Sequence, residues 1–214
     1  MPTPDFDLYL VTDQSQTQGR DLLWVLEQAL EAGVKAIQLR EKALGGKELF
    51  LLAEAARVLT QRYHAALLVN DRIDVALAVG ADGVHLGRNS LPIPTARALL
   101  GAQRLIGAST HALEEVQEAE RKGADFVVFG PVYFTASKAS YGAPQGLTAL
   151  KISVENSALP VYAIGGLKPG NILEAKHTGI RGIALISAIV SAPDPKKAAE
   201  EIIRLLSEMS GCKK

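Results

Sequence analysis

The sequence has only one cysteine, Cys212, so an internal disulfide and a cysteine-based metal site are both excluded. Aromatic residues are only 5% of the 214 positions. No uninterrupted apolar run approaches the roughly 20 residues that span a bilayer. The amino terminus lacks the basic start and apolar core of a secretory signal. We therefore expect a protein of the reducing cytoplasm that makes no use of a membrane.

Net charge is also missing, because Lys plus Arg and Asp plus Glu both number 23. No overall field draws the chain toward nucleic acid, so we expect no nucleic-acid partner. Affinity for an anion must then come from a local cluster of cations. The hydrophobic content of 48% is ample for a sizeable core. Apolar helix faces leave a monomer and a homo-oligomer both open.

Short apolar runs alternate with longer amphipathic segments along the whole chain. The runs predicted as strands are Leu8–Val11, Ala36–Leu39, Ala66–Val69, Gly83–His85, Leu105–Gly107, Phe126–Phe129, Val161–Ile164 and Gly182–Ile186. The segments predicted as helices are Asp21–Ala32, Lys47–Arg62, Ile73–Val79, Pro94–Leu100, Leu113–Lys122, Leu147–Ser157, Pro169–Thr178 and Pro195–Met209. Strict alternation of this kind indicates a parallel sheet.

Eight such units favour a closed (β/α)8 TIM barrel over an open doubly wound sheet. The Rossmann-like alternative requires a glycine fingerprint after its first strand, whereas Leu8–Val11 runs into Thr12, Asp13 and Gln14. No linker or low-complexity tract divides the chain. We expect one barrel domain over residues 1–214, with a frayed tail after about residue 209.

A parallel barrel builds its active site from the carboxyl ends of its strands. The second predicted strand runs into Gln38, Arg40 and Lys42, which would share one face of an extended chain. One amide and two cations on one face suit a ligand rich in anionic oxygens, such as a diphosphate. The other interpretation is a strand that enters a solvated, charged loop.

Asn70 and Asp71 follow the third predicted strand. They could cap the helix that begins near Ile73, since Asn and Asp are good N-caps. They could equally supply oxygen to Mg²⁺, which takes carboxylates together with substrate phosphates. Both interpretations stay open from the residues alone.

Two histidines, His85 and His111, fall at predicted strand ends, where each is either a structural group or a catalyst. Thr135, Ser137 and Lys138 bring two hydroxyls and a cation to a long loop at residues 130–146. A loop of this length is either a lid over the site or a solvated surface segment.

Paired glycines end the seventh strand, at Gly165 and Gly166, and Ile186 and Ser187 end the eighth. TIM barrels commonly bind a phosphate there, because glycines let backbone N–H groups approach the ligand. Together with the cations after the second strand, this predicts two anion sites. The ligand would carry phosphate at both ends, or two phosphorylated substrates would bind.

Taken in order, these segments resemble the thiamine phosphate synthase (ThiE)/TenI superfamily over essentially the whole chain. The matching segments are Gln38–Lys42, Asn70–Arg72, Asp82–Gly87, Gly107–His111, Gly130–Pro131, Thr135–Lys138, Ile164–Gly166 and Ile186–Ile189. Each motif is weak alone, and their combination in this order is specific.

The resemblance implies a (β/α)8 barrel that joins hydroxymethylpyrimidine diphosphate to a thiazole phosphate and releases pyrophosphate, with Mg²⁺. Its partners would be small phosphorylated thiamine precursors. It implies that the diphosphate is held by Gln38, Arg40, Lys42, Asn70, Ser109 and Lys138. It places Mg²⁺ on Asp71, with Thr135 and Ser137 near the two rings. It places the thiazole phosphate on Gly166, Ile186 and Ser187.

One position departs from the synthase pattern, because Ser90 stands where a second acidic Mg²⁺ ligand is usual. TenI-like members include a thiazole tautomerase that needs no metal, in which the counterpart of His111 moves a proton. Lys42, Asn70 and Asp71 favour the synthase, since a tautomerase has no evident need of them. A non-catalytic barrel that binds a phosphorylated ligand is a third alternative.

Overall fold

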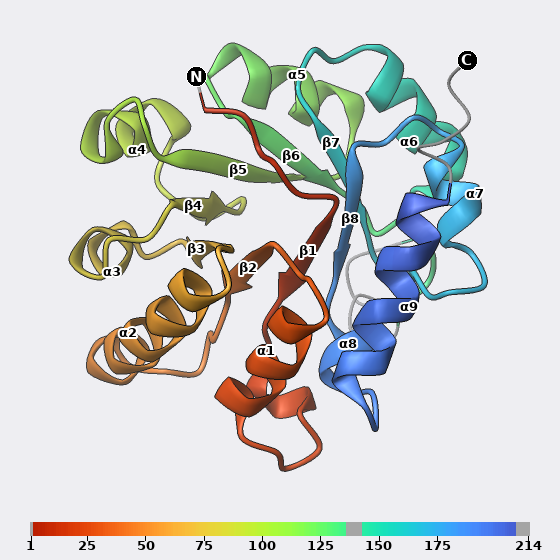
Figure 1. The fold of residues 1–214 in the computed structure, drawn as a ribbon. Helices are drawn as coiled ribbons and strands as arrows, with labels where there is room; N and C mark the ends of the chain where they lie inside the picture. Colours follow the sequence, from red (N-terminus) through yellow and green to blue (C-terminus); the bar gives the residue numbers. More distant parts are fainter. Residues whose placement is uncertain (1, 136–142, 209–214) are drawn as a thin grey trace.

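The computed structural model describes residues 2–135 and 143–208, which form a closed barrel of eight parallel strands. Each strand pairs with the next along the chain, and β8 closes the circle by pairing with β1 (Figure 1). This confirms the predicted single TIM barrel and excludes the open Rossmann-like sheet. The expected frayed tail lies outside the described residues. The strands are β1 (Leu8–Val11), β2 (Ala36–Leu39), β3 (Ala66–Asn70), β4 (Gly83–Leu86), β5 (Leu105–Thr110), β6 (Phe126–Phe129), β7 (Val161–Ile164) and β8 (Gly182–Leu185).

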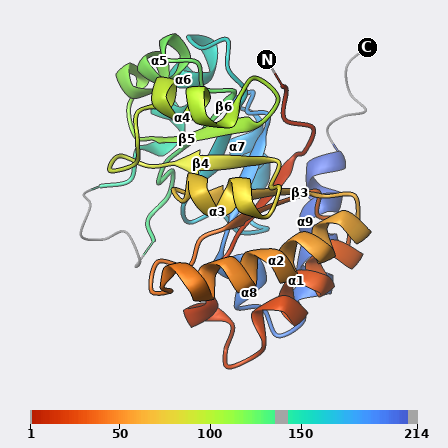
Figure 2. The same cartoon turned by 90° about the vertical axis from the view of Figure 1, so that its left-hand side faces the viewer.

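Helices form the outer layer around the strands (Figures 1 and 2). The last helix packs against the first, which completes the ring. No helix in the described part of the chain is long and apolar enough to cross a bilayer. The helices are the 3-10 turn η1 (Gln14–Gln16), α1 (Leu22–Glu31), α2 (Gly46–Arg62), α3 (Ile73–Ala78), α4 (Ile93–Leu100), α5 (Leu113–Arg121), α6 (Gly146–Glu155), α7 (Ile172–Lys176), α8 (Ser187–Val190) and α9 (Pro195–Ser207).

Both faces of every strand are covered, which explains why the strands read as continuous apolar runs. In β1, Leu8 and Leu10 point outward into the large core between strands and helices. Tyr9 and Val11 point inward to a second core that fills the barrel. Side chains alternate between the two cores along each strand, as the pleat requires.

Phe6, in the segment before β1, closes the amino-terminal end of the barrel. Its ring lies 5.2 Å from Tyr162 and meets Phe126 edge to face at 5.7 Å. The hydroxyl of Tyr162 donates to the carbonyl of Phe6 at 2.7 Å. The described side chains close this end, so the site is expected at the opposite end, where the strands have their carboxyl ends.

Most elements lie within two residues of their predicted bounds, and three differences are larger. β5 extends three residues beyond Gly107, because its parallel pairing with β6 continues after the apolar run ends. The helix predicted over 169–178 is only α7, since the side chain of Asn171 accepts from the N–H of Lys168 and holds a turn there. The four-residue α8 was not predicted, because it is too short to show helical periodicity.

Candidate active site

Three neighbouring strands bring predicted site residues together at the carboxyl end of the barrel. Asn70 pairs in register with His85, and His85 pairs with Gly107. Ser109, two residues further along β5, places its Oγ 2.9 Å from Nε2 of His85. His85 is buried, Asn70 is half-buried and Ser109 is exposed. The row runs from the barrel interior to its mouth.

The two cations after β2 take a different position from the one predicted. β2 ends at Leu39, so the alternation of a strand does not carry on to Arg40 and Lys42. Gln38 is buried at 3% exposure, Arg40 is half-buried and Lys42 is exposed. The two cations nevertheless line one cavity, from a loop and not from a shared strand face.

Glu41, between the two cations, is a site residue that the sequence did not single out. It is 8% exposed, and its Oε2 accepts from the backbone N–H of Gln14 at 3.0 Å. Its other oxygen, Oε1, is buried and accepts no hydrogen bond from the described residues. Burial raises the pKa of Glu41, against the opposing effect of Thr12 and the Gln14 N–H. Its place between two cations is the sequence feature that could have identified Glu41 as a site residue.

Thr12 joins the same two loops. Its backbone N–H donates to the carbonyl of Gln38 at 2.9 Å, and its Oγ1 accepts from the backbone N–H of Arg40 at 2.9 Å. The segment that carries Arg40 is thus fixed by backbone hydrogen bonds. Its guanidinium group is free to interact with a ligand while its main chain stays in place.

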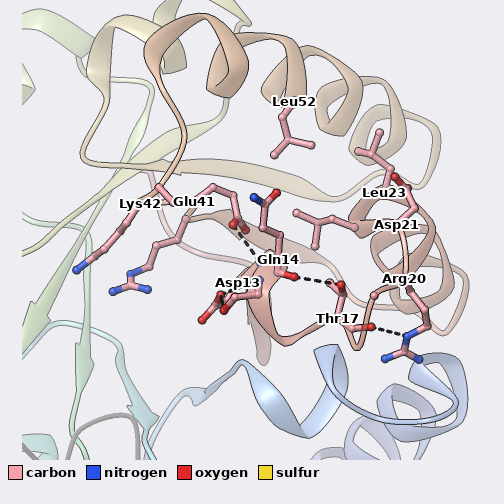
Figure 3. A pocket seen from close by; sticks show the side chains of 14 residues that line it. Asp13, Gln14, Thr17, Arg20, Asp21, Leu23, Glu41, Lys42 and Leu52 are labelled. Atoms are coloured by element: carbon pink, nitrogen blue, oxygen red, sulfur yellow. Dashed lines mark hydrogen bonds between the residues drawn. The ribbon is translucent and has the colours of Figure 1, made fainter.

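The cavity has a volume of about 630 Å³. Among the described residues, its lining comes from the segments after β1 and β2 and from the helices α1 and α2. Figure 3 shows the carboxylate of Glu41 pointing to Gln14, while Lys42 points away from Leu52. Asn70, His85 and Ser109 are not in this lining, so the cavity flanks the barrel mouth.

His85 lies in a tight apolar environment. Its ring is 5.9 Å from that of Tyr9 and 6.1 Å from that of Phe126. Burial, reinforced by the nearby charge of Arg40, lowers the pKa of His85 to about 3, so the ring is neutral near pH 7. A Cβ on Gly107 would lie 2.7 Å from its Nδ1 and 2.4 Å from Cζ of Phe126, so only glycine fits opposite the ring.

Asp71 is exposed at the mouth and has a left-handed backbone with φ of 64°. Its N–H donates to the carbonyl of His85 at 2.9 Å, which fixes it beside β4. The helix that follows has Arg72 as its N-cap and no side-chain cap, so neither Asn70 nor Asp71 caps it. The capping interpretation is wrong, and the carboxylate of Asp71 is available for a ligand.

Ser90 does not substitute for an acidic metal ligand. Its Oγ accepts from the backbone N–H of Gly87 at 2.8 Å and closes a turn after β4. Among the described residues, no group of three His, Cys, Asp or Glu side chains could hold a metal ion. Mg²⁺ commonly binds through one or two carboxylates plus substrate phosphates. Asp71 therefore fits Mg²⁺ only if phosphate oxygens complete the coordination.

The backbone conformation and the close packing after β7 require glycine at two positions. Gly165 and Gly166 have φ of 97° and 67°, a conformation that favours glycine. A Cβ on Gly165 would lie 2.5 Å from Cβ of Pro131, and one on Gly166 would lie 2.6 Å from the carbonyl of Phe134. The pair allows the segment after β6 to lie against the end of β7. A phosphate site there stays a prediction.

The remaining predicted residues lie around the same end of the barrel. Ile186 is half-buried after β8, and exposed Ser187 begins α8. Thr135 is half-buried. His111 is exposed after β5, and its N–H donates to Glu115 at 2.7 Å. Ser137 and Lys138 lie outside the described residues, as does most of the loop predicted as a lid.

Comparison with known proteins identifies the family of the chain. The family model described as thiamine monophosphate synthase matches residues 8–189. A protein of Geobacter sulfurreducens is 52% identical over 206 residues, with 96% of this chain and 97% of that protein covered. A thiamine-phosphate synthase of Syntrophomonas wolfei is 42% identical, with 94% and 97% covered. The solved structure of thiamine phosphate pyrophosphorylase from Pyrococcus furiosus is 40% identical, superposes with a TM-score of 0.87 and covers 95% of this chain and 96% of its own.

The family match covers most of the chain, and the relatives are matched over nearly their full length. The segments that carry the site residues, from Gln38 to Ser187, all lie within the matched range. This chain belongs to the thiamine monophosphate synthase family.

Proposed function

We propose that the mouth of this barrel joins hydroxymethylpyrimidine diphosphate to thiazole phosphate, with release of pyrophosphate and formation of thiamine phosphate. The reaction is that of a transferase. The observation that carries the proposal is the position of Arg40 and Lys42, which line one cavity beside the row Asn70, His85 and Ser109. Cations next to amide and hydroxyl donors suit a diphosphate.

Charge governs the proposed mechanism. Departure of the diphosphate leaves a benzyl-like pyrimidine cation, so the barrier falls when the leaving group's growing negative charge is neutralised. Arg40 and Lys42 would supply that charge from the loop after β2, and the resemblance adds Lys138. The thiazole nitrogen then attacks the cation. Each preorganised donor is worth roughly 10²–10³ in rate.

We place Mg²⁺, when it is bound, on the carboxylate of Asp71. The ion would add positive charge beside the diphosphate and so help neutralise the leaving group. Asn70 precedes this carboxylate and would donate its amide hydrogens to a diphosphate oxygen. With one carboxylate available, the phosphate oxygens of the substrate would supply much of the coordination.

The second substrate would bind at the ends of β7 and β8, on the other side of β1 from the cations. Gly166, Ile186 and Ser187 would hold its phosphate, since Ser187 begins a helix directly after β8. Thr135 and Ser137, the latter by resemblance alone, would line the region where the two rings meet. This arrangement orients the thiazole nitrogen toward the carbon that loses the diphosphate.

The thiazole tautomerase is the weaker alternative. Ser90 departs from the synthase pattern, but Lys42, Asn70 and Asp71 are present and a tautomerase has no evident need of them. The named relatives at 42% and 40% identity are synthases or pyrophosphorylases. A regulatory barrel without turnover would be excluded by measurable product. We also propose a cytoplasmic location, which cell fractionation would test.

The deciding experiment is an assay of the purified protein with both synthase substrates, with and without Mg²⁺, that measures thiamine phosphate. Mg²⁺-dependent product that is lost in Arg40→Ala supports the proposal. Absence of product, together with conversion of the carboxythiazole phosphate isomer that is lost in His111→Ala, would identify the tautomerase instead.

A further inference from the structure

The buried His85 and the exposed Ser109 share one hydrogen bond, whose direction the heavy atoms leave open. Nε2 and Oγ are 2.9 Å apart. In one arrangement Nε2 carries the hydrogen and donates to Oγ. In the other, the hydroxyl donates to a bare Nε2 and the hydrogen of the neutral ring is on Nδ1. In the first arrangement Nδ1 is an acceptor without a hydrogen, and in the second it is a donor that needs an acceptor.

Nδ1 has no hydrogen-bond partner within the described residues, and it is buried. A buried N–H group without an acceptor is rarer in proteins than a buried acceptor without a donor. Its surroundings point the same way. A Cβ on Gly107 would lie 2.7 Å from Nδ1, so the hydrogen that Gly107 carries in that direction faces Nδ1. A C–H group complements a lone pair weakly and opposes an N–H.

We propose that His85 is a positioning residue that carries its hydrogen on Nε2, donates it to Ser109, and thereby leaves the serine hydroxyl free to donate to an anionic ligand at the barrel mouth. The role in ligand binding rests on the function proposed above. The tautomer itself does not, because it follows from the contacts of the ring alone.

The direction of this bond decides what Ser109 offers. When Nε2 occupies one lone pair of Oγ, the O–H points elsewhere, and Ser109 is exposed on the mouth side. A diphosphate oxygen then meets a donor. In the reverse arrangement the ligand would meet only lone pairs, which repel an anion. A serine hydroxyl can either donate or accept a hydrogen bond. With His85 fixed as the donor to Oγ, the hydroxyl of Ser109 acts as a donor toward the ligand.

The first test is the nitrogen NMR signature of the histidine rings, measured on the unmodified protein. Long-range ¹H–¹⁵N correlations distinguish a ring that is protonated at Nε2 from one protonated at Nδ1. The chain has four histidines, and His85→Gln identifies the signal of His85 by its loss. Protonation at Nε2 is expected. Protonation at Nδ1 would overturn the proposal.

The second test measures binding of inorganic pyrophosphate by calorimetry and turnover by steady-state kinetics. Ser109→Ala is expected to weaken pyrophosphate binding by about 10- to 100-fold, the value of a hydrogen bond to a charged group. His85→Leu should show a similar loss, and the double variant should be no worse than Ser109→Ala. His85→Gln, whose amide can donate to Oγ, should recover most of the affinity.

His177→Leu serves as the matched control, because His177 is exposed at the end of α7, in the connection that leads to the amino-terminal end of β8. Its affinity and turnover should not change. Additive losses in His85→Leu and Ser109→Ala, or full affinity in a folded His85→Leu, would overturn the positioning role. An unmodified protein that binds pyrophosphate and is protonated at Nε2, yet makes no thiamine phosphate, would support this proposal and contradict the proposed function alone.

Discussion

The backbone N–H of Gln14 donates to Oε2 of Glu41 at 3.0 Å, and this bond joins the loop after β1 to the loop after β2. Glu41 lies between Arg40 and Lys42, so the bond fixes the segment that carries both cations. The carboxylate is therefore buried for a structural purpose in the middle of a charged run.

Replacement of this carboxylate should loosen the two loops. We expect Glu41→Leu to raise the KM for the diphosphate substrate roughly tenfold, which corresponds to about 1.4 kcal/mol. Glu41→Gln keeps a carbonyl oxygen for the Gln14 N–H and should retain most of the affinity. Steady-state kinetics of both variants test this, and equal losses in the two would show that the charge matters more than the hydrogen bond.

A buried ion pair at the other end of the barrel should contribute strongly to stability. Asp125, whose side chain is fully buried, accepts from Arg97 at 2.6 Å and from the N–H of Ile106 at 2.7 Å. Asp125→Ala leaves the guanidinium with backbone carbonyls as its only partners among the described residues and removes the acceptor of the buried Ile106 N–H. It should therefore lower the free energy of unfolding by about 3–5 kcal/mol. Chemical denaturation measures this loss.

An exposed ion pair provides the control for this experiment. Glu118 and Lys122 pair along α5 with both side chains about half exposed. Glu118→Ala should leave the free energy of unfolding nearly unchanged, because water screens an exposed ion pair. Similar losses in Glu118→Ala and Asp125→Ala would contradict the importance given to the buried pair.

Gly107 should not tolerate even a methyl group. The added Cβ would lie 2.4 Å from Phe126 and 2.7 Å from His85, inside the packed barrel. We expect Gly107→Ala to cost about 1–3 kcal/mol of unfolding free energy through overpacking. Gly170→Ala is the control, because its Cβ would meet nothing within 4 Å. Thermal and chemical unfolding of the two variants should differ clearly.

The neutral His85 should make the fold sensitive to acid. Its pKa is about 3 in the folded protein, against the usual 6.5 of a histidine, so below pH 6.5 the unfolded chain binds a proton that the folded chain does not. Stability should fall by up to about 1.4 kcal/mol per pH unit between pH 6.5 and pH 3 from this group. His85→Gln should show a shallower dependence in denaturation at several pH values.

A second carboxylate should strengthen metal binding. Ser90 closes a turn by accepting from Gly87, an interaction that an aspartate can also make. We expect Ser90→Asp to lower the Mg²⁺ concentration for half-maximal activity by roughly tenfold, or about 1.4 kcal/mol. Ser90→Ala should leave it unchanged. Titration with Mn²⁺ in the presence of pyrophosphate gives a readout that does not depend on turnover.

The barrel could be predicted because its signal is local and repeated. Each strand is a short apolar run, and each is followed by an amphipathic helix, so the period alone indicates the topology. The ends of the strands were harder to predict. The predicted strand stops at Gly107 before the polar Ser109 and Thr110, yet their pairing with Val128 and Phe129 continues β5. The end of β5 therefore depends on β6, which is its neighbour in the barrel, and not on the residues of β5 alone.

The part of the site that has a local sequence signal could be predicted, and the part that depends on contacts between distant segments could not. Arg40 and Lys42 were found as a cluster, but the predicted strand face was wrong because β2 ends before them. Glu41 was overlooked, because an acid between two cations looks solvated until Gln14, 27 residues away, is seen to donate to it. The bond between His85 and Ser109 also spans 24 residues and leaves no mark on the local sequence.

In the described part of the chain, the amino-terminal end of the barrel is closed by Phe6, Phe126 and Tyr162, which leaves the carboxyl end as its opening. Two substrates must enter and two products must leave through the same opening. Molecules that share one opening compete for it, so bound thiamine phosphate would have to leave before the next pair of substrates could occupy the site.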